Sequence, residues 1–222
     1  MVRRIVCSMM VVLLSLFSGA ADAGAQLGRR SNGLSSEPGY WVGLSVGYVD
    51  GFTTSDQATG GLWQIGYTSQ LRATLEKSLQ RGASIGVAAA FSNAPLTYNN
   101  GNSFDVNCIG SCAAHVDITQ YLAFVRAGGS GTGFHGMFNL EGGVTSFSNF
   151  RESGTDTRLE PTTQKYDPTF GFGAGFGYGF SRSTELYADG LTDIILHKQA
   201  SGAVSQSAPH QTTLRAGLRI GF

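Results

Sequence analysis

The sequence predicts an all-β protein, a closed, antiparallel, up-and-down barrel of eight transmembrane strands. Three observations lead to this prediction. Apolar and polar residues alternate with a period of two in eight separate segments, as in strands with one apolar and one polar face. The connections between these segments are alternately long and short. The composition is unusual as well, because 32 of the 222 residues are glycine and only 14% are charged, whereas a soluble domain needs a charged surface.

The first 23 residues are typical of a cleaved signal peptide. Arg3 and Arg4 form a basic start, residues 5–17 form an apolar core, and Ala-Asp-Ala at 21–23 is a suitable cleavage site. A helix that spans a membrane needs about 20 apolar residues, whereas this core has only thirteen. We therefore expect that residues 1–23 are removed after export.

Two further parts are expected in the mature chain. Residues 24–39 contain Gly, Ser and Arg without periodicity and are expected to be a flexible periplasmic leader, and residues 40–222 are expected to form the barrel. No segment after the signal peptide is long and apolar enough for a spanning helix, so membrane insertion is expected to use strands. Because the chain ends with a strand, no separate periplasmic domain is expected.

The eight alternating segments each have an apolar row, expected to face lipid, and an opposite row of polar residues or glycine, expected to face the lumen. The segments are 40–48, 63–79, 84–92, 115–126, 134–148, 169–181, 185–196 and 211–222. The lipid-facing row expected in 115–126 consists of Val116, Ile118, Leu122 and Phe124, and Gln120 interrupts it. A soluble barrel would instead bury the apolar rows, but its solvent face would then contain the uncharged glycines of 171–179. This composition favours the membrane barrel.

The connections between the segments also favour a membrane barrel. Three of them are short, and the other four are long and polar, near 50–62, 93–114, 149–165 and 197–210. Membrane barrels alternate in this way between short periplasmic turns and long outer loops. Aromatic residues near the segment ends are expected to form an interfacial girdle, and they are Tyr40, Trp41, Tyr48, Trp63 and Tyr67.

The last segment, 211–222, carries a resemblance to a known family. Its even positions are mostly apolar, its odd positions are polar or glycine, and the chain ends on Phe222. It resembles the last strand of bacterial outer-membrane β-barrels, and residues 40–222 as a whole resemble the small eight-stranded proteins of the OmpA/OmpX type. This resemblance implies a location in the cell outer membrane and contact with outer-membrane lipids and lipopolysaccharide. It also implies that the barrel-assembly machinery reads Phe222 as an assembly signal.

Charged residues on the expected lumen rows form the candidate site. Eight strands leave an interior just wide enough for side chains, and unpaired buried charges are costly, so we expect an ion-pair network that fills the lumen. Its members are Arg72, Glu76, Glu141, Glu185, Asp189, Asp193, Arg215 and Arg219. The alternative is a narrow gated ion path, in which Arg215 or Arg219 exchanges carboxylate partners. Glycines on the lumen row of 169–181 are expected to let Tyr187 lie across the backbone.

Two cysteines, Cys108 and Cys112, lie in the second long connection. Export to an oxidising compartment favours a local disulfide between them. Together with His115 they would supply three metal ligands. No fourth ligand is evident in the sequence, so no metal site and no cofactor are predicted.

The expected function is a structural or interaction role, in which extracellular loops contact a ligand or surface and side chains close the lumen. The first alternative is a narrow passive pore for small polar or hydrophobic solutes. The second is a lipid-modifying enzyme, which needs a Ser–His or Asp–His arrangement. His115 and His197 lie near the outer rim with Asp117 or Asp193 close in sequence, but no His-x-Ser pair occurs, so we expect no enzyme. With 15 basic and 15 acidic residues, nothing indicates nucleic-acid binding.

Overall fold

The computed structural model describes residues 38–55, 61–79, 82–99, 110–128, 131–159, 166–197 and 209–222. The predicted signal peptide and most of the predicted leader lie outside these ranges, and both remain predictions. Within the described ranges, no helix is long and apolar enough to cross a membrane.

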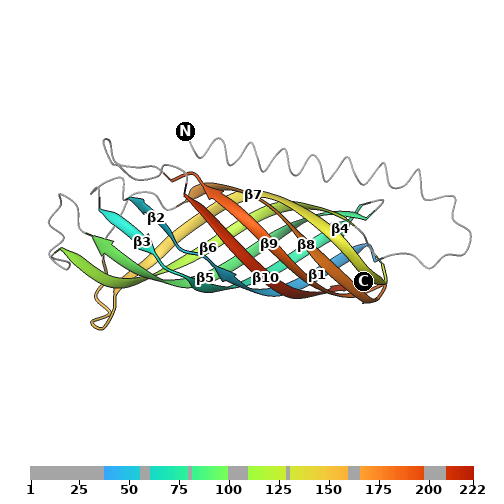
Figure 1. The fold of residues 1–222 in the computed structure, drawn as a ribbon, viewed down its shortest axis with the longest axis horizontal. Helices are drawn as coiled ribbons and strands as arrows, with labels where there is room; N and C mark the ends of the chain where they lie inside the picture. Colours follow the sequence, from blue (N-terminus) through green and yellow to red (C-terminus); the bar gives the residue numbers. More distant parts are fainter. Residues whose placement is uncertain are drawn as a thin grey trace, which may run out of the picture. The chain divides into compact units, whose positions relative to one another are not determined.

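The described residues form ten strands (Figure 1). They are β1 (Tyr40–Val49), β2 (Phe52–Ser55), β3 (Leu62–Ile65), β4 (Thr68–Ser78), β5 (Ala83–Asn99), β6 (Ser111–Gly128), β7 (Gly133–Glu152), β8 (Asp167–Ser181), β9 (Thr184–Ile195) and β10 (His210–Gly221). Each strand pairs antiparallel with its neighbours, in the order β2-β3-β5-β4-β1-β10-β9-β8-β7-β6. A further pairing between β5 and β6 closes the sheet into a ring.

This ring is the predicted eight-stranded barrel. β1 and β2 follow each other along one wall of the ring, as do β3 and β4, because both β3 and β4 pair with β5. Counting each of these interrupted pairs once gives eight strands, so the prediction of a closed antiparallel barrel is confirmed. The seam joins the two ends of the described barrel. Tyr40 N donates to Phe222 O at 3.1 Å, and Phe222 N donates to Tyr40 O at 2.9 Å.

The two ends of the barrel differ. The short connections β4–β5, β6–β7 and β8–β9 lie at the same end as Tyr40 and Phe222, and we call this the turn end. β2, β3 and the strand ends that the long connections β5–β6, β7–β8 and β9–β10 join lie at the opposite end, the loop end. This arrangement is the alternation of short and long connections that the sequence indicates.

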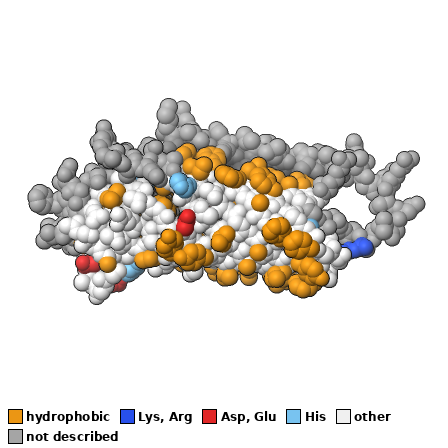
Figure 2. Space-filling model, in the orientation of Figure 1, with side chains coloured by type: hydrophobic (Ala, Val, Ile, Leu, Met, Phe, Trp, Pro, Cys, Tyr) orange, Lys and Arg blue, Asp and Glu red, His pale blue; other side chains and the backbone are white. Residues whose placement is uncertain are grey.

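The outer wall of the barrel is apolar, and the inner face is polar around mid-height. On β8, for example, Phe172, Phe176 and Phe180 are all more than half exposed, while the glycines between them face inward. Figure 2 shows hydrophobic side chains spread over the visible flank with few charged ones among them. A surface of this kind is unfavourable in water and suits lipid. The membrane orientation of the barrel is therefore confirmed over soluble packing.

One strand faces the other way from our prediction. In β6 the row containing Val116, Ile118, Leu122 and Phe124 is buried, with each side chain 3% exposed or less. The outward row instead contains Tyr121, which is 55% exposed. The prediction that the first row faces lipid is wrong, because Gln120 belongs to that row and its amide is used inside the barrel.

The predicted strand 63–79 is also divided, and its two parts face opposite ways. Trp63 and Ile65 in β3 point inward, whereas Leu71 in β4 points outward, so the alternation inverts near Gly66. The same inversion occurs between β1 and β2, near Gly51. As a result Trp63 lies inside, and Trp41 is buried as well, so neither belongs to the expected girdle.

The inversion depends on a close approach of two glycines. The pairing of Phe52 with Ile65 places Gly51 beside Gly66. A Cβ atom at Gly51 would overlap the Ile65 carbonyl oxygen and would lie 3.2 Å from the Gly66 backbone. A residue with a side chain therefore does not fit at this bend.

Candidate functional site

The candidate site is the filled interior of the barrel. All eight charged residues predicted to face the lumen are buried there, with exposures of 7% or less. A layer of charged side chains occupies the half nearer the turn end, and a layer of apolar side chains occupies the loop end.

Glu76, on β4, is the centre of the charged layer nearest the turn end. Its two oxygens accept from Arg126 at 2.8 Å and from Arg219 at 3.2 Å, and Ser84 also donates to it at 2.8 Å. Arg219 bridges further to Glu185 at 2.7 Å. These contacts join β4, β5, β6, β9 and β10 across the lumen.

The middle of the charged layer contains two bidentate ion pairs. Arg72 on β4 donates to both oxygens of Glu141 on β7, at 3.1 and 2.7 Å. Arg215 donates to both oxygens of Asp189 at 2.8 Å, and these two residues are directly opposite in the β9–β10 register. Paired charges with several hydrogen bonds offset the cost of leaving water.

Asp193 is the exception among the eight predicted residues. The other seven form ion pairs within 4.0 Å, whereas Asp193 accepts a hydrogen bond from Gln120 at 3.3 Å and has no ion pair among the described residues. It lies towards the loop end, where the charged layer meets the apolar one. Gln120 also accepts from Gln70 at 3.0 Å, so an amide pair marks this boundary.

Arg126, His135 and Asn139 also belong to the network, although the sequence does not predict them as site residues. Arg126 was missed because the facing of β6 was reversed, and Gln120, in the same row, was the available signal. His135 and Asn139 lie on the polar row of segment 134–148 but carry no permanent charge. In the structure His135 Nε2 lies 3.1 Å from Glu185, and Asn139 joins Arg126 at 3.0 Å to Asp189 at 2.9 Å.

Two aromatic rings pack against Arg72 and Arg126. Phe124 lies between Arg72 and Arg126, with the guanidinium carbons 5.6 and 5.7 Å from the ring centroid. Tyr187 lies 5.0 Å from Arg126 and covers Gly217 of β10, where an added Cβ would lie 2.7 Å from the ring. Such stacking is favourable for a desolvated guanidinium. Tyr187 thus covers a glycine, as the sequence suggests, although the nearest one is on β10 rather than β8.

A small cavity remains at the turn end of the charged layer. Its volume is about 30 Å³, and its lining includes Trp41, Arg126 and Arg219, so it has room for about one or two water molecules. Arg219 Nε is buried without a hydrogen-bond partner among the described residues.

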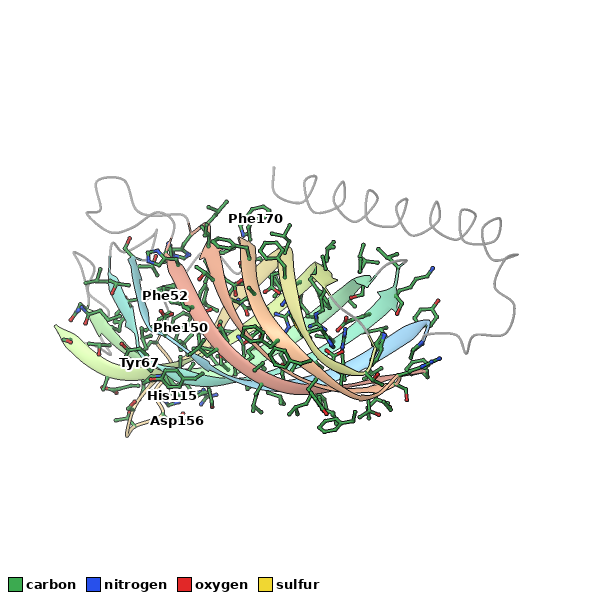
Figure 3. All side chains as sticks on the ribbon, turned by 45° about the vertical axis from the view of Figure 1, so that its right-hand side comes forward. Phe52, Tyr67, His115, Phe150, Asp156 and Phe170 are labelled. Carbon is green, nitrogen blue, oxygen red and sulfur yellow. The ribbon has the colours of Figure 1, made fainter. Side chains whose placement is uncertain are left out.

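The loop end of the lumen is closed by an apolar cluster. Phe52 and Phe150 come together there from β2 and β7 (Figure 3), and the whole cluster contains Phe52, Trp63, Ile65, Ala94, Leu96, Tyr98, Ala114, Val116, Ile118, Phe147, Phe150, Leu159 and Ile195. Three aromatic contacts lie within it, including Trp63 with Phe150 at 4.9 Å between ring centroids. These side chains fill the described part of the lumen at the loop end.

A histidine and an aspartate are buried beside this cluster. His197 Nδ1 lies 2.5 Å from Asp167 Oδ2, and its Nε2 lies 3.0 Å from the carbonyl oxygen of Ser55. Both side chains are 3% exposed or less. The sequence placed His197 near the outer rim but suggested Asp193 as its partner, whereas the structure brings it to Asp167.

Only one cysteine of the predicted disulfide, Cys112, lies within the described residues. Cys112 packs against the apolar cluster, whereas Cys108 lies outside the described residues, so the disulfide remains a prediction. Within the described part of the chain, no group of three or more His, Cys, Asp or Glu side chains is placed to hold a metal ion.

Comparison with known proteins addresses the fold. No family model matches the sequence, and no curated protein matches it. Among solved structures, Neisserial surface protein A aligns with a TM-score of 0.53 at 12% identity, over 85% of this chain and 100% of that chain. The outer membrane protein OprG from Pseudomonas aeruginosa gives 0.56 at 12% identity, over 85% and 99%. The outer membrane protein AlkL gives 0.51 at 15% identity, over 87% and 94%.

The chain has the fold of a small outer-membrane β-barrel. Together with the apolar outer wall, this fold places the protein in the outer membrane. Identities of 12 to 15% show the architecture only, so a specific role has to be argued from the residues of this chain.

Proposed function

We propose that this protein is a non-enzymatic outer-membrane barrel with a closed lumen, whose extracellular loops have a structural or binding role. The observation that carries the proposal is that two layers of side chains fill the interior. Charged residues cross the lumen in one half, and the apolar cluster occupies the other. A barrel filled in this way works as a scaffold for what its loop end presents.

Contacts that cross the lumen support closure most strongly. Arg72 and Glu141 lie on β4 and β7, on different sides of the ring, and both are almost fully buried. Breaking such a pair leaves an uncompensated charge in a low-dielectric interior. A conducting path through this layer would have to break several of these pairs at once.

The absence of a catalytic role is proposed because of the surroundings of the histidines. His197 and Asp167 form the Asp–His contact that a hydrolase would use, but both are buried beside Trp63 and Phe147. His135 is likewise enclosed next to Glu185. Among the described residues, side chains enclose both histidine rings.

Outer-membrane lipids and lipopolysaccharide are the proposed surroundings of the loop end. Outside the barrel wall, Asp117 accepts from Asn93 at 2.7 Å and from Asn149 at 2.6 Å. This outward polar group follows the apolar wall towards the loop end, at the height expected for lipid headgroups. Near the same end the Arg151 side chain is 43% exposed, and a guanidinium suits the anionic phosphate groups of lipopolysaccharide. Wild-type protein should therefore retain more lipopolysaccharide on purification than Arg151→Ala. Equal amounts would contradict contact at this site.

Conductance measurement tests the closed lumen. Purified protein in a planar bilayer should give a conductance near background, because no path crosses the two layers. Arg215→Ala tests the gated ion path, and Phe176→Leu on the outer wall is the matched control. Large, steady conductance in the wild type that Arg215→Ala abolishes would overturn the proposal and favour a narrow passive pore.

A further inference from the structure

We propose that the cavity at the turn end of the charged layer is a binding site for a small inorganic anion of the size of chloride. This inference concerns the turn end of the lumen and does not depend on what the loops bind. It rests on the charges that line the cavity, on a buried donor of Arg219 and on the size of the space.

The lining of the cavity carries positive charge. Among the described residues it contains the side chains of Arg126, Arg182 and Arg219 and no aspartate or glutamate. The carboxylates that pair with two of these arginines, Glu76 and Glu185, belong to the charged layer and lie outside this lining. An anion in the cavity therefore faces cationic groups directly, and Coulomb attraction in a partly buried site offsets its loss of hydration.

Arg219 supplies a donor that lacks an acceptor. The residue is 5% exposed, and its terminal nitrogens donate to Glu76 at 3.2 Å and to Glu185 at 2.7 Å. Its Nε is buried without a hydrogen-bond partner among the described residues. A buried donor on a charged group is costly to leave unsatisfied. An anion bound beside Arg219 accepts from this N–H and forms a charge-assisted hydrogen bond.

The position of Arg219 is fixed before any ligand binds. Its guanidinium carbon lies 4.6 Å from the centroid of the Trp41 ring, and Trp41 Nε1 donates to Ser78 Oγ at 3.1 Å. The Ser78 hydroxyl donates in turn to the carbonyl oxygen of Pro38 at 2.7 Å. Trp41, Ser78 and Pro38 all line the cavity. Because these groups are already in place, little conformational entropy is lost when the anion binds.

The size of the cavity selects the class of anion. Its volume is about 30 Å³, which is room for about one or two water molecules. A halide is only slightly larger than a water molecule and fits this space. Phosphate groups, sugars and carboxylic acids with a carbon chain are larger. Chloride is therefore the natural ligand by both charge and size.

The cavity also lies where the three short connections of the barrel meet. Leu79 of the β4–β5 connection, Gly131 of the β6–β7 connection and Arg182 of the β8–β9 connection all contribute to the lining. Leu79 and Arg182 are exposed at this end, so the anion enters from the turn end without crossing the charged layer. Once bound, it joins Arg219 to the turns and strengthens this end of the barrel.

Bromide quenching of Trp41 fluorescence tests the site. The chain has only two tryptophans, so Trp63→Phe leaves Trp41 as the single reporter beside Arg219. Bromide takes the place of chloride and quenches tryptophan on contact. In this parent protein, quenching should saturate as bromide replaces gluconate, an anion too large for the cavity, at constant ionic strength. Chloride at the concentration of the saturating bromide should reduce the saturable quenching about twofold, because two ions of similar affinity share one site.

Arg219→Lys, introduced into the parent, tests the role of the Nε donor. The ammonium keeps a positive charge beside Glu76 and Glu185 but has no Nε–H, so the saturable quenching should be lost. Arg158→Lys makes the same change at an exposed arginine near the loop end and should behave like the parent. Acrylamide, which needs no anion site, should quench Trp41 equally in all three proteins, and heat-dependent gel mobility shows that each is folded.

Two results would overturn the proposal. The first is quenching by bromide that rises linearly in the parent and does not respond to chloride, because it would show that no anion is bound. This comparison uses the parent alone, so it decides the question even where Arg219→Lys does not fold. The second is saturable, chloride-sensitive quenching that survives Arg219→Lys, because it would place the anion elsewhere.

Discussion

Arg72 and Glu141 illustrate why a buried charge in the lumen needs a partner of opposite charge. The pair is bidentate and almost fully buried, and Phe124 covers the guanidinium. Removing one charge leaves the other without compensation, whereas removing both leaves a space that apolar side chains can fill. Comparing the stability of single and double variants therefore shows whether the ion pair contributes to the stability of the barrel.

Arg72→Ala should destabilise the folded barrel by about 3–5 kcal/mol, the cost of breaking a buried ion pair. The double variant Arg72→Met with Glu141→Leu should recover most of this loss. Urea unfolding in detergent micelles measures both free energies. If the single and double variants lose the same stability, the cost does not come from the unpaired Glu141.

At the residue scale, the sequence predicted the facing of the charged residues but not their partners. Alternation placed Arg215 and Asp189 in the lumen, but only the register shows that they lie directly opposite. The sequence does not predict Arg126 because its own row on β6 is mostly apolar, and apolar rows on a membrane strand are expected to face lipid. Phe124 and Leu122 face inward because even a charged lumen needs side chains that fill its volume.

At the element scale, the outer row of β8 defines the lipid contact. Phe176 lies in the middle of the strand, is 59% exposed and stacks on Phe134 at 5.3 Å. Phe180 lies on the same face close to the turn end. Depth in the bilayer therefore differs between two residues of the same type.

Phe176→Arg should cost about 2–4 kcal/mol, and Phe180→Arg should cost about 1 kcal/mol or less, because the penalty for a lipid-facing charge falls towards the interface. Phe176→Leu is the control for loss of the ring. Denaturant titration in lipid vesicles gives the three values. A similar cost at both depths would mean that this face does not contact the bilayer core.

The hairpin is the element that the sequence did not predict. Segment 63–79 was interpreted as one strand because its odd positions are largely apolar throughout. The structure inverts the facing at Gly66, so apolar Ile65 and apolar Leu71 belong to different environments. Periodicity does not distinguish a lipid-facing row from an apolar row that fills the mouth, since both are hydrophobic.

At the scale of the whole molecule, the seam between β1 and β10 closes the barrel. Phe222 hydrogen-bonds to Tyr40 through its backbone and stacks on its ring at 6.2 Å. Closure removes the free edges that would otherwise pair with other chains. Alternation and connection lengths were sufficient to predict this topology, because eight strands with both ends on one side have few other arrangements.

Deletion of Phe222 should lower the amount of folded protein in the outer membrane while export continues, if this residue acts as the assembly signal. Phe222→Tyr should be tolerated, because it keeps an aromatic ring at the interface. Immunoblots of membrane and periplasmic fractions give the distribution. Normal membrane levels of the deletion variant would show that Phe222 is not an assembly signal.

The central claim is that the chain forms a closed barrel in the outer membrane. Gel mobility of heated and unheated outer-membrane fractions tests it most directly, because a closed barrel resists detergent until it is heated. The unheated protein should be found in the membrane fraction and migrate differently from the heated protein. Recovery in the soluble fraction, with the same mobility before and after heating, would contradict the account.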